Sequence, residues 1–278
     1  MEETATAVEE SSQPTPAASC KHNAAFHLAP AAGGHVCKCQ KLVWPRRIHA
    51  LSGLLFTGFL LIHLGVSAMA VRPELYQAAV NQVESVLAFS PGLILSAIFL
   101  PFAVQAGLGL YLVQHHGLRY NVKKCNRGGK LRFFLQRWSG LAILAFFLFH
   151  VGTLHMWGLH LAYRLTHASA LAGYAAGGLF QPQAAFASTV QGITHVFGGA
   201  AANGVLLAAT LLAVLLTAFH AGNGAWTGGI VWKISGTRVN ATLWTAFSWA
   251  IGAALVLLGT SSLYTLSCGP SARALLGR

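Results

Sequence analysis

Five long stretches of this chain carry few charged side chains, at about 46–70, 91–116, 134–160, 193–230 and 241–267. Each is long enough to cross a bilayer core of about 30 Å, which takes about 20 helical residues. Only 9% of the 278 residues are charged, whereas a soluble domain carries about 25%. We therefore predict an all-α, multi-pass membrane protein with a five-helix bundle over residues 42–270, in the cell membrane.

Lys and Arg residues beside these stretches are unevenly divided. Fourteen lie before the first stretch or in the second-to-third and fourth-to-fifth connections, and four lie on the other side. The positive-inside rule then predicts a cytoplasmic N-terminus and an external C-terminus. The net charge of +12 fits cytoplasmic loops on an anionic leaflet, and no nucleic-acid-binding module is recognisable.

Acidic residues are scarce and histidines abundant. The chain has six Glu, no Asp and 13 His, and the Glu residues lie outside the apolar stretches, at Glu2, Glu3, Glu9, Glu10, Glu74 and Glu84. This excludes paired-carboxylate catalysis, carboxylate-rich Mg or Ca sites and carboxylate proton relays within the bilayer. The abundance of His favours chemistry with metals and electrons.

Two histidines are expected at the same depth. His63 and His150 each follow the inner end of their stretch by enough residues to lie about 25 Å from the cytoplasmic face. Two neutral imidazoles on different helices are what a bis-His b haem requires, because its iron takes one axial nitrogen on each face. The alternative is that each is a core histidine hydrogen-bonded to a hydroxyl or carbonyl. His220 lies nearer the inner face, where the residue at matching depth on the second stretch is Gln105, which is not a usual haem ligand.

The N-terminal 41 residues form a predicted cytoplasmic tail. Its segment 20–39 holds five potential soft or borderline metal ligands, Cys20, His22, His35, Cys37 and Cys39. On the reducing side of a membrane such clustering favours a metal over a disulfide, and mixed Cys and His ligation is typical of a Rieske [2Fe–2S] centre. A flexible linker with incidental thiols is the alternative. Cys125 and Cys268 have no evident connection to this segment.

Several motifs together resemble one family. They are Arg46-Arg47-Ile48-His49 with Gly53 and His63, Leu100-Pro101, Gln136-Arg137-Trp138-Ser139-Gly140 with His150, and Phe219-His220 with Asn223-Gly224 and Trp226. Over about 43–240 the chain resembles the five-helix membrane anchor, or cytochrome b subunit, of succinate dehydrogenase and fumarate reductase, respiratory complex II.

The resemblance implies cofactors as well as a fold. The family holds two b haems, and the matching positions here are His63 with His150 for the distal haem and Gln105 with His220 for the proximal one. Gln105 departs from that pattern. A haem-free subgroup, type F, carries a Rieske-like cluster, so the resemblance allows a [2Fe–2S] cluster, one haem b, or both. The cluster candidates are Cys20, His22, His35, Cys37, Cys39 and His220.

The function implied is that of a membrane-anchor and quinone-binding subunit of succinate dehydrogenase. Electrons would come from a docked iron–sulfur subunit, and the succinate-oxidising site would belong to a flavoprotein partner, because no Gly-rich FAD-binding turn is recognisable in this chain. Polar and aromatic residues near the inner face are the quinone-site candidates, since Arg or His stabilises charge on a quinone oxygen and Trp stacks on its ring. They are Trp44, Arg47, His49, Ser52, Gln136, Arg137 and Trp138.

Two other functions stay open. One is the cytochrome b anchor of another dehydrogenase or of a hydrogenase, which should carry two complete bis-His pairs. The other is a non-redox membrane protein, either a transporter or an assembly factor, which should bind no iron.

Overall fold

The computed structural model describes residues 42–89, 95–116, 127–152, 166–167, 180–194 and 200–277, and these residues contain helices and no strands. The Cys/His segment at 20–39 and Cys125 lie outside the described residues. Within the described part the all-α prediction is therefore confirmed.

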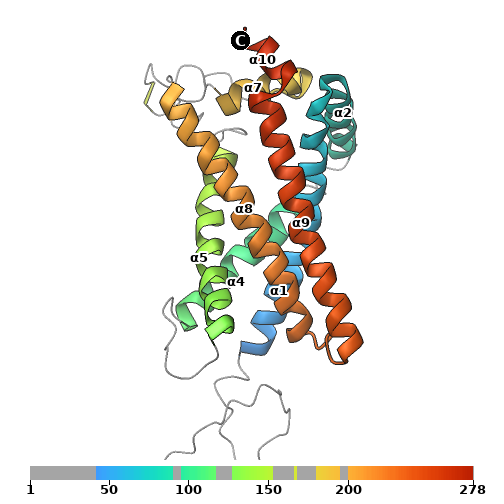
Figure 1. The fold of residues 1–278 in the computed structure, drawn as a ribbon, viewed down its shortest axis with the longest axis vertical. Coiled ribbons are helices and arrows are strands. Elements are labelled where there is room, and N and C mark those ends of the chain that lie inside the picture. Colours follow the sequence, from blue (N-terminus) through green and yellow to red (C-terminus); the bar gives the residue numbers. More distant parts are fainter. Residues whose placement is uncertain are drawn as a thin grey trace, which may run out of the picture. The chain divides into compact units, whose positions relative to one another are not determined.

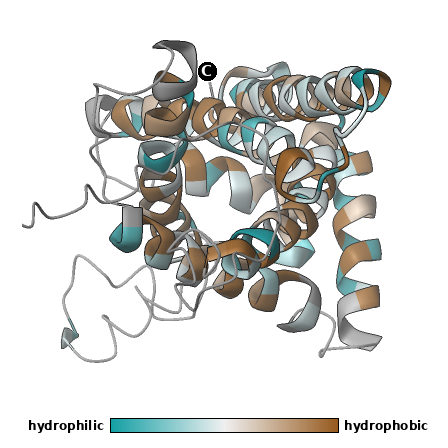
Figure 2. Cartoon of the chain, turned by 90° about the horizontal axis from the view of Figure 1, so that it is seen from below, coloured by the Kyte–Doolittle hydropathy of each residue, from teal (hydrophilic) through white to brown (hydrophobic). Residues whose placement is uncertain are grey.

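Four helices in the described part are long and apolar enough to cross a membrane. They are α1 (Val43–Ala68), α5 (Arg127–His150), α8 (Ala200–Val231) and α9 (Arg238–Cys268), and Figure 1 shows them running lengthwise. Figure 2, a view from below, shows brown, apolar segments on many helices of the bundle. The multi-pass membrane prediction is confirmed.

A shorter helix, α4 (Leu100–His116), follows a π-helical turn, η3 (Leu95–Phe99), in the second predicted stretch. It packs against α1 and more lightly against α5. The five-helix count and the orientation across the membrane stay predictions.

The positions of several helix ends differ from the sequence expectation. α5 begins at Arg127 instead of 134, and α8 begins at Ala200 instead of 193, after a short helix α7 (Ala185–Thr194). Hydropathy could not place these ends, because polar turns continue a membrane helix into the headgroup layer.

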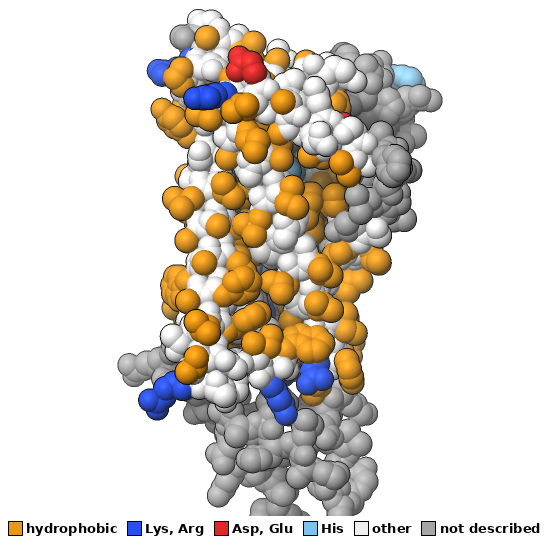
Figure 3. All heavy atoms as spheres, turned by 90° about the vertical axis from the view of Figure 1, so that its right-hand side faces the viewer, with side chains coloured by type: hydrophobic (Ala, Val, Ile, Leu, Met, Phe, Trp, Pro, Cys, Tyr) orange, Lys and Arg blue, Asp and Glu red, His pale blue; other side chains and the backbone are white. Residues whose placement is uncertain are grey.

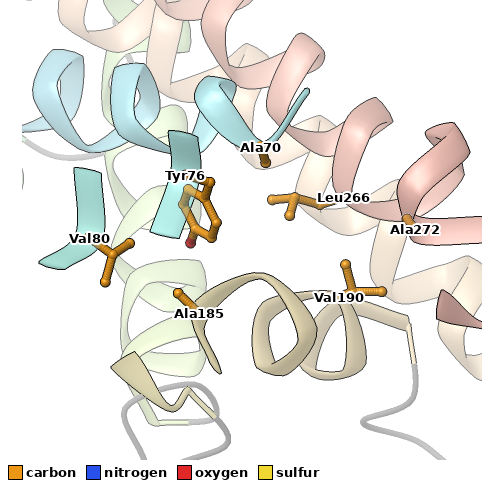
Figure 4. Close-up of a cluster of buried hydrophobic side chains, with 7 residues drawn as sticks. All are labelled: Ala70, Tyr76, Val80, Ala185, Val190, Leu266 and Ala272. Atoms are coloured by element: carbon orange, nitrogen blue, oxygen red, sulfur yellow. The ribbon is translucent and has the colours of Figure 1, made fainter. Parts of the chain in front are cut away.

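A helical cap that the sequence did not predict lies at one end of the long helices. It comprises η2 (Met69–Val71), α2 (Pro73–Phe89), η6 (Pro182–Ala184), α7 and α10 (Pro270–Leu275). Figure 4 shows its apolar core, which consists of Ala70, Tyr76, Val80, Ala185, Val190, Leu266 and Ala272. The Tyr76 and Thr189 hydroxyls lie 3.2 Å apart and connect α2 to α7.

The other end, which we call the basic end, holds the starts of α1, α5 and α9 and the last turn of α8. Arg47 of α1 donates to the carbonyl of Val231 at the end of α8, at 3.4 Å. Figure 3 shows Lys and Arg side chains at both ends of the visible face with an apolar belt between them, as expected for a membrane protein.

Several hydroxyl side chains within the long helices are satisfied within their own helix. Thr57 donates to the carbonyl of Gly53 at 2.7 Å, and Ser67 donates to that of His63 at 2.9 Å. Such bonds within one helix allow polar residues to lie at membrane depth without an unpaired donor.

Candidate functional site

His63 of α1 and His150 at the end of α5, here called the distal pair, face each other. Their ring centroids lie 6.2 Å apart, with the ring planes at 80°. Two imidazoles that bind one iron from opposite faces have centroids about 6 Å apart, because each metal–nitrogen bond is about 2 Å long. The structure thus brings together the two side chains that the sequence placed at one depth, at a separation that suits bis-imidazole ligation.

Phenylalanines surround the distal pair. Phe59 stacks on His63 at 5.7 Å and Phe146 stacks on His150 at 5.8 Å, centroid to centroid. Towards the basic end, three further rings from α1, α4 and α5 contact one another, namely Phe56, Phe102 and Phe147. This aromatic group makes the level below the distal pair apolar, which excludes water from it.

A second group of polar side chains lies nearer the basic end, and we call it the basic-side cluster. Its members come from α1, α4, α5 and α8 and are His49, Ser52, Gln105, Arg132, Gln136, Ser139, His220 and Asn223. The quinone-site candidates therefore belong to two hydrogen-bonded groups, His49 and Ser52 with Gln105, and Gln136 with His220.

On the α1/α4 side, Gln105 connects two α1 residues. The Ser52 hydroxyl donates to Gln105 Oε1 at 2.9 Å, and Gln105 Nε2 lies 3.3 Å from His49 Nε2. Because the amide nitrogen can only donate, His49 Nε2 is the acceptor and the ring carries its proton on Nδ1. That buried Nδ1 has no hydrogen-bond partner among the described residues.

On the α5/α8 side, Ser139 holds the ring of His220. The Ser139 oxygen lies 3.2 Å from the carbonyl of Gln136 and 3.1 Å from His220 Nδ1. The hydroxyl can donate to the carbonyl and accept from Nδ1–H, or donate to Nδ1 itself, and in both cases the bond orients the ring.

Arg132 and Asn223 complete the network but were not among the predicted site residues. Arg132 Nε donates to Asn223 Oδ1 at 2.9 Å, and Asn223 Nδ2 donates to Gln136 Oε1 at 2.7 Å. Arg132 also lies over the ring of Trp226, 4.1 Å from its centroid. The sequence already showed the motif that contains Asn223 and Trp226. It gave no reason to choose Arg132 from the several basic residues between the second and third predicted stretches.

Four glycines leave room for side chains of the basic-side cluster. Each glycine lies four residues after a cluster residue on the same helix. A Cβ at these glycines would lie close to a side chain on the partner helix: Gly53 to Gln105 at 2.9 Å, Gly109 to His49 at 3.3 Å, Gly140 to His220 at 2.8 Å, and Gly224 to Gln136 at 3.5 Å. The α1/α4 and α5/α8 pairs thus pack in the same reciprocal way. The spacing His-x-x-x-Gly or Gln-x-x-x-Gly is a sequence signal that could have identified Gln105 and His49 as one unit.

The remaining quinone-site candidates lie apart from this cluster at the basic end. Arg47 lies over the rings of Trp44 and Trp232, 5.4 and 5.2 Å from their centroids. Arg137 lies 4.0 Å from the centroid of Phe133, and the Trp138 side chain is exposed.

An apolar pocket of about 210 Å³ opens among α1, α8, α9 and the turn that joins α8 to α9. Leu51, Trp232 and Trp244 are among its lining residues. Because Arg47 contacts Trp232, a cationic side chain lies beside this pocket.

The predicted iron–sulfur ligands are not brought together within the described residues. His220 is the one candidate of that set that lies there, and Cys268 is a free, exposed cysteine at the capped end. The described residues contain no group of three or more His, Cys, Asp or Glu side chains that could hold a metal ion.

Comparison with known proteins identifies a distant relative. The chain is 27% identical over 221 residues to the succinate dehydrogenase cytochrome b558 subunit of Bacillus subtilis (strain 168), which covers 79% of this chain and 94% of the relative. No family model matches the chain, and no solved structure matches it. The resemblance inferred from the motifs is confirmed as distant homology between two membrane proteins.

Proposed function

We propose that this chain is the membrane-anchor and quinone-binding subunit of a succinate:quinone oxidoreductase. It would hold the iron–sulfur and flavoprotein subunits at the membrane and connect them to a quinone. The distal pair carries this proposal, because two imidazoles at ligation distance are expected of a cytochrome b and the distant relative is named as one.

The donor set of the distal pair fits a haem b. A haem supplies four equatorial nitrogens itself and requires only two axial ligands from the protein, whereas zinc in a structural site takes four protein ligands. When bound, the haem would supply one-electron transfer by cycling its iron between two oxidation states. His63 and His150 would hold it, and the Phe59 and Phe146 rings would limit the movement of the imidazoles and exclude water.

The basic end suits both docking and quinone binding. If it faces the cytoplasm, as the charge distribution predicts, its Arg and Lys side chains would meet the soluble subunits. A quinone ring would enter the apolar pocket beside Trp232, and Arg47 would stabilise the negative charge that builds on the quinone oxygen. Trp44 would hold the guanidinium in place from its other side.

A Rieske-like cluster is the second cofactor candidate. It would need thiolates from the segment 20–39, which lies outside the described residues, together with two histidines. The name of the distant relative favours haem. A cytochrome b anchor of another dehydrogenase or hydrogenase would differ from our proposal in its soluble partner and in carrying two complete bis-His pairs.

Purification of the tagged chain from its native membrane tests this proposal. We expect a succinate-oxidising flavoprotein and an iron–sulfur subunit to copurify with the chain. The complex should reduce quinone with succinate, and its spectrum after dithionite addition should show the α band of a b haem. Arg47→Ala should lower quinone reduction at least tenfold and leave succinate oxidation by a soluble dye intact, and Arg273→Ala at the capped end serves as control. Copurification of a different dehydrogenase would contradict the succinate assignment. Iron with acid-labile sulfide but no α band would show that the cofactor is an iron–sulfur cluster and not a haem.

A further inference from the structure

We propose that α2 is a membrane-surface helix that contacts phospholipids at the capped end of the bundle. Its contact surface is a row of apolar residues, here called the α2 row, which consists of Leu75, Ala79, Val83 and Val86. This surface lies in the cap and not at the basic end, so its role does not depend on which dehydrogenase docks there.

The side chains of α2 form three faces. Tyr76 and Val80 are buried in the apolar core of the cap, and Figure 4 shows them on the side of α2 that faces α7. The α2 row repeats at intervals of four, four and three residues, so it forms a second face. The third face is exposed and polar, and it consists of Glu74, Asn81, Glu84 and Ser85. At about 100° per residue, this polar face lies nearly opposite the α2 row.

The α2 row is exposed although α2 is already packed into the cap by another face. Leu75, Val83 and Val86 are 49%, 37% and 45% exposed. Exposed apolar side chains also continue along the chain from the end of α1 through Met69 and Val71 to α2. Because the surface of a membrane-spanning helix such as α1 is covered by lipid, the same lipid layer can cover the α2 row and remove it from water.

The level of α2 matches the edge of a bilayer. Leu266 of α9 belongs to the same apolar core as Tyr76. Leu266 follows Arg238, the first residue of α9 at the basic end, by 28 residues, which is about 42 Å along the helix. A bilayer measures about 30 Å across its hydrocarbon core and about 40–45 Å with its polar layers. If Arg238 lies in one headgroup layer, α2 therefore lies in the other.

The direction of α2 also fits a helix at the membrane surface. Figure 2, which looks along the long helices, shows α2 at its right-hand edge lying across their direction. A helix in this orientation can direct one face to the acyl chains and the opposite face to water, as the α2 row and the polar face would do. Arg72, exposed immediately before α2, places a cationic side chain where lipid phosphates lie.

An α2 held at the surface would fix the depth of α1. Arg72 alone separates α2 from η2, which continues directly from α1. The position of α2 in the headgroup layer would thus determine how far His63, which precedes Leu75 by twelve residues, extends into the bilayer.

Photocrosslinking of the full chain in its native membrane tests the lipid contact. p-Benzoylphenylalanine would replace one residue at a time, and mass spectrometry would identify what the irradiated side chain joins. Leu75 and Val86 positions should give phospholipid adducts, as should the exposed Leu257 of α9, whereas Glu74 and Glu84 positions should not. Adducts to another polypeptide at the α2 row, or lipid adducts at Leu257 alone, would overturn the proposal. Equal lipid adducts on both faces of α2 would overturn it as well.

A second measurement covers the case in which the labelled chains do not accumulate. Val86→Asp and its neighbour Ser85→Asp introduce the same charge on the α2 row and on the polar face. In nanodiscs of phosphatidylcholine and phosphatidylglycerol, Val86→Asp should lower the Tm of the purified complex, because a carboxylate is unfavourable among acyl chains. Ser85→Asp should leave the Tm unchanged. Equal Tm values for the two variants would overturn the proposal.

Discussion

The distal pair and the basic-side cluster differ in what holds their histidines. His63 and His150 lie among stacked phenylalanines, whereas His49 and His220 are held by serine and glutamine side chains. An aromatic environment is nonspecific and tolerates small shifts, but hydrogen bonds fix a tautomer and a ring direction. We infer that cofactor binding at the distal pair depends mainly on the two histidines themselves. In the basic-side cluster, the positions of the histidine rings depend equally on their hydrogen-bond partners.

The largest effect is expected from removal of a distal ligand. His150→Ala should abolish the distal haem completely, because it removes one of the two imidazoles that face each other. The haem stoichiometry of the purified complex should fall by one per chain. Unchanged stoichiometry would show that the distal pair binds no haem.

Gly140→Ala should affect the basic-side cluster nearly as strongly. Its Cβ would lie 2.8 Å from His220 Cε1, so the ring must move. Alanine otherwise stabilises a helix by about 0.5–1 kcal/mol relative to glycine, and Gly58→Ala on α1 is the matched control because no atom lies within 4 Å of its Cβ. We expect a lower rate of succinate-dependent quinone reduction in Gly140→Ala alone. Equal rates in both variants would mean that the position of the His220 ring is unimportant.

A smaller effect is expected from Ser139→Ala, which removes the hydrogen-bond partner of His220 Nδ1. The ring loses its orienting bond but is not displaced, so succinate-dependent quinone reduction should fall less than in Gly140→Ala. The initial rate of quinone reduction by the purified complex measures this change. Ser67→Ala is the control, since Ser67 donates only to the carbonyl of His63. Equal rates in the two variants would contradict the orienting role of Ser139.

The smallest effect concerns the cap at the far end. Burial raises the pKa of Tyr76, and its hydrogen bond to Thr189 opposes part of that rise. The folded state thus favours the neutral phenol, so this stabilisation is present below the unfolded pKa of about 10 and is lost as the pH rises above it. Tyr76→Phe should lose about 1 kcal/mol of unfolding free energy at pH 8 and show less destabilisation at alkaline pH.

Thermal unfolding in detergent at pH 8 and at alkaline pH measures the Tyr76 effect. Tyr264→Phe, at an exposed site on α9, is the control. Identical pH dependence of wild type and Tyr76→Phe would refute the assignment to Tyr76.

The long helices and the distal pair were predictable from the sequence for simple reasons. A bilayer requires long apolar helices, and equal rise per residue brings His63 and His150 to one level. The cap was not predictable, because the amphipathic α2 and short α7 are stabilised by contacts distant in sequence, such as Tyr76 with Thr189.

The contact between His49 and Gln105 was missed for a different reason. The position of a residue along a helix gives its depth, but it does not show which neighbouring helix its side chain reaches.

The central claim is that His220 lies between the soluble subunits and the distal pair, and reduction of the His220→Ala complex tests it most directly. Absorbance of the b haem would be followed in purified His220→Ala complex and in wild type after addition of succinate or dithionite. We predict that dithionite reduces the haem held by His63 and His150 while succinate does not, although succinate still reduces a soluble dye. Reduction of that haem by succinate at the wild-type rate would contradict the account.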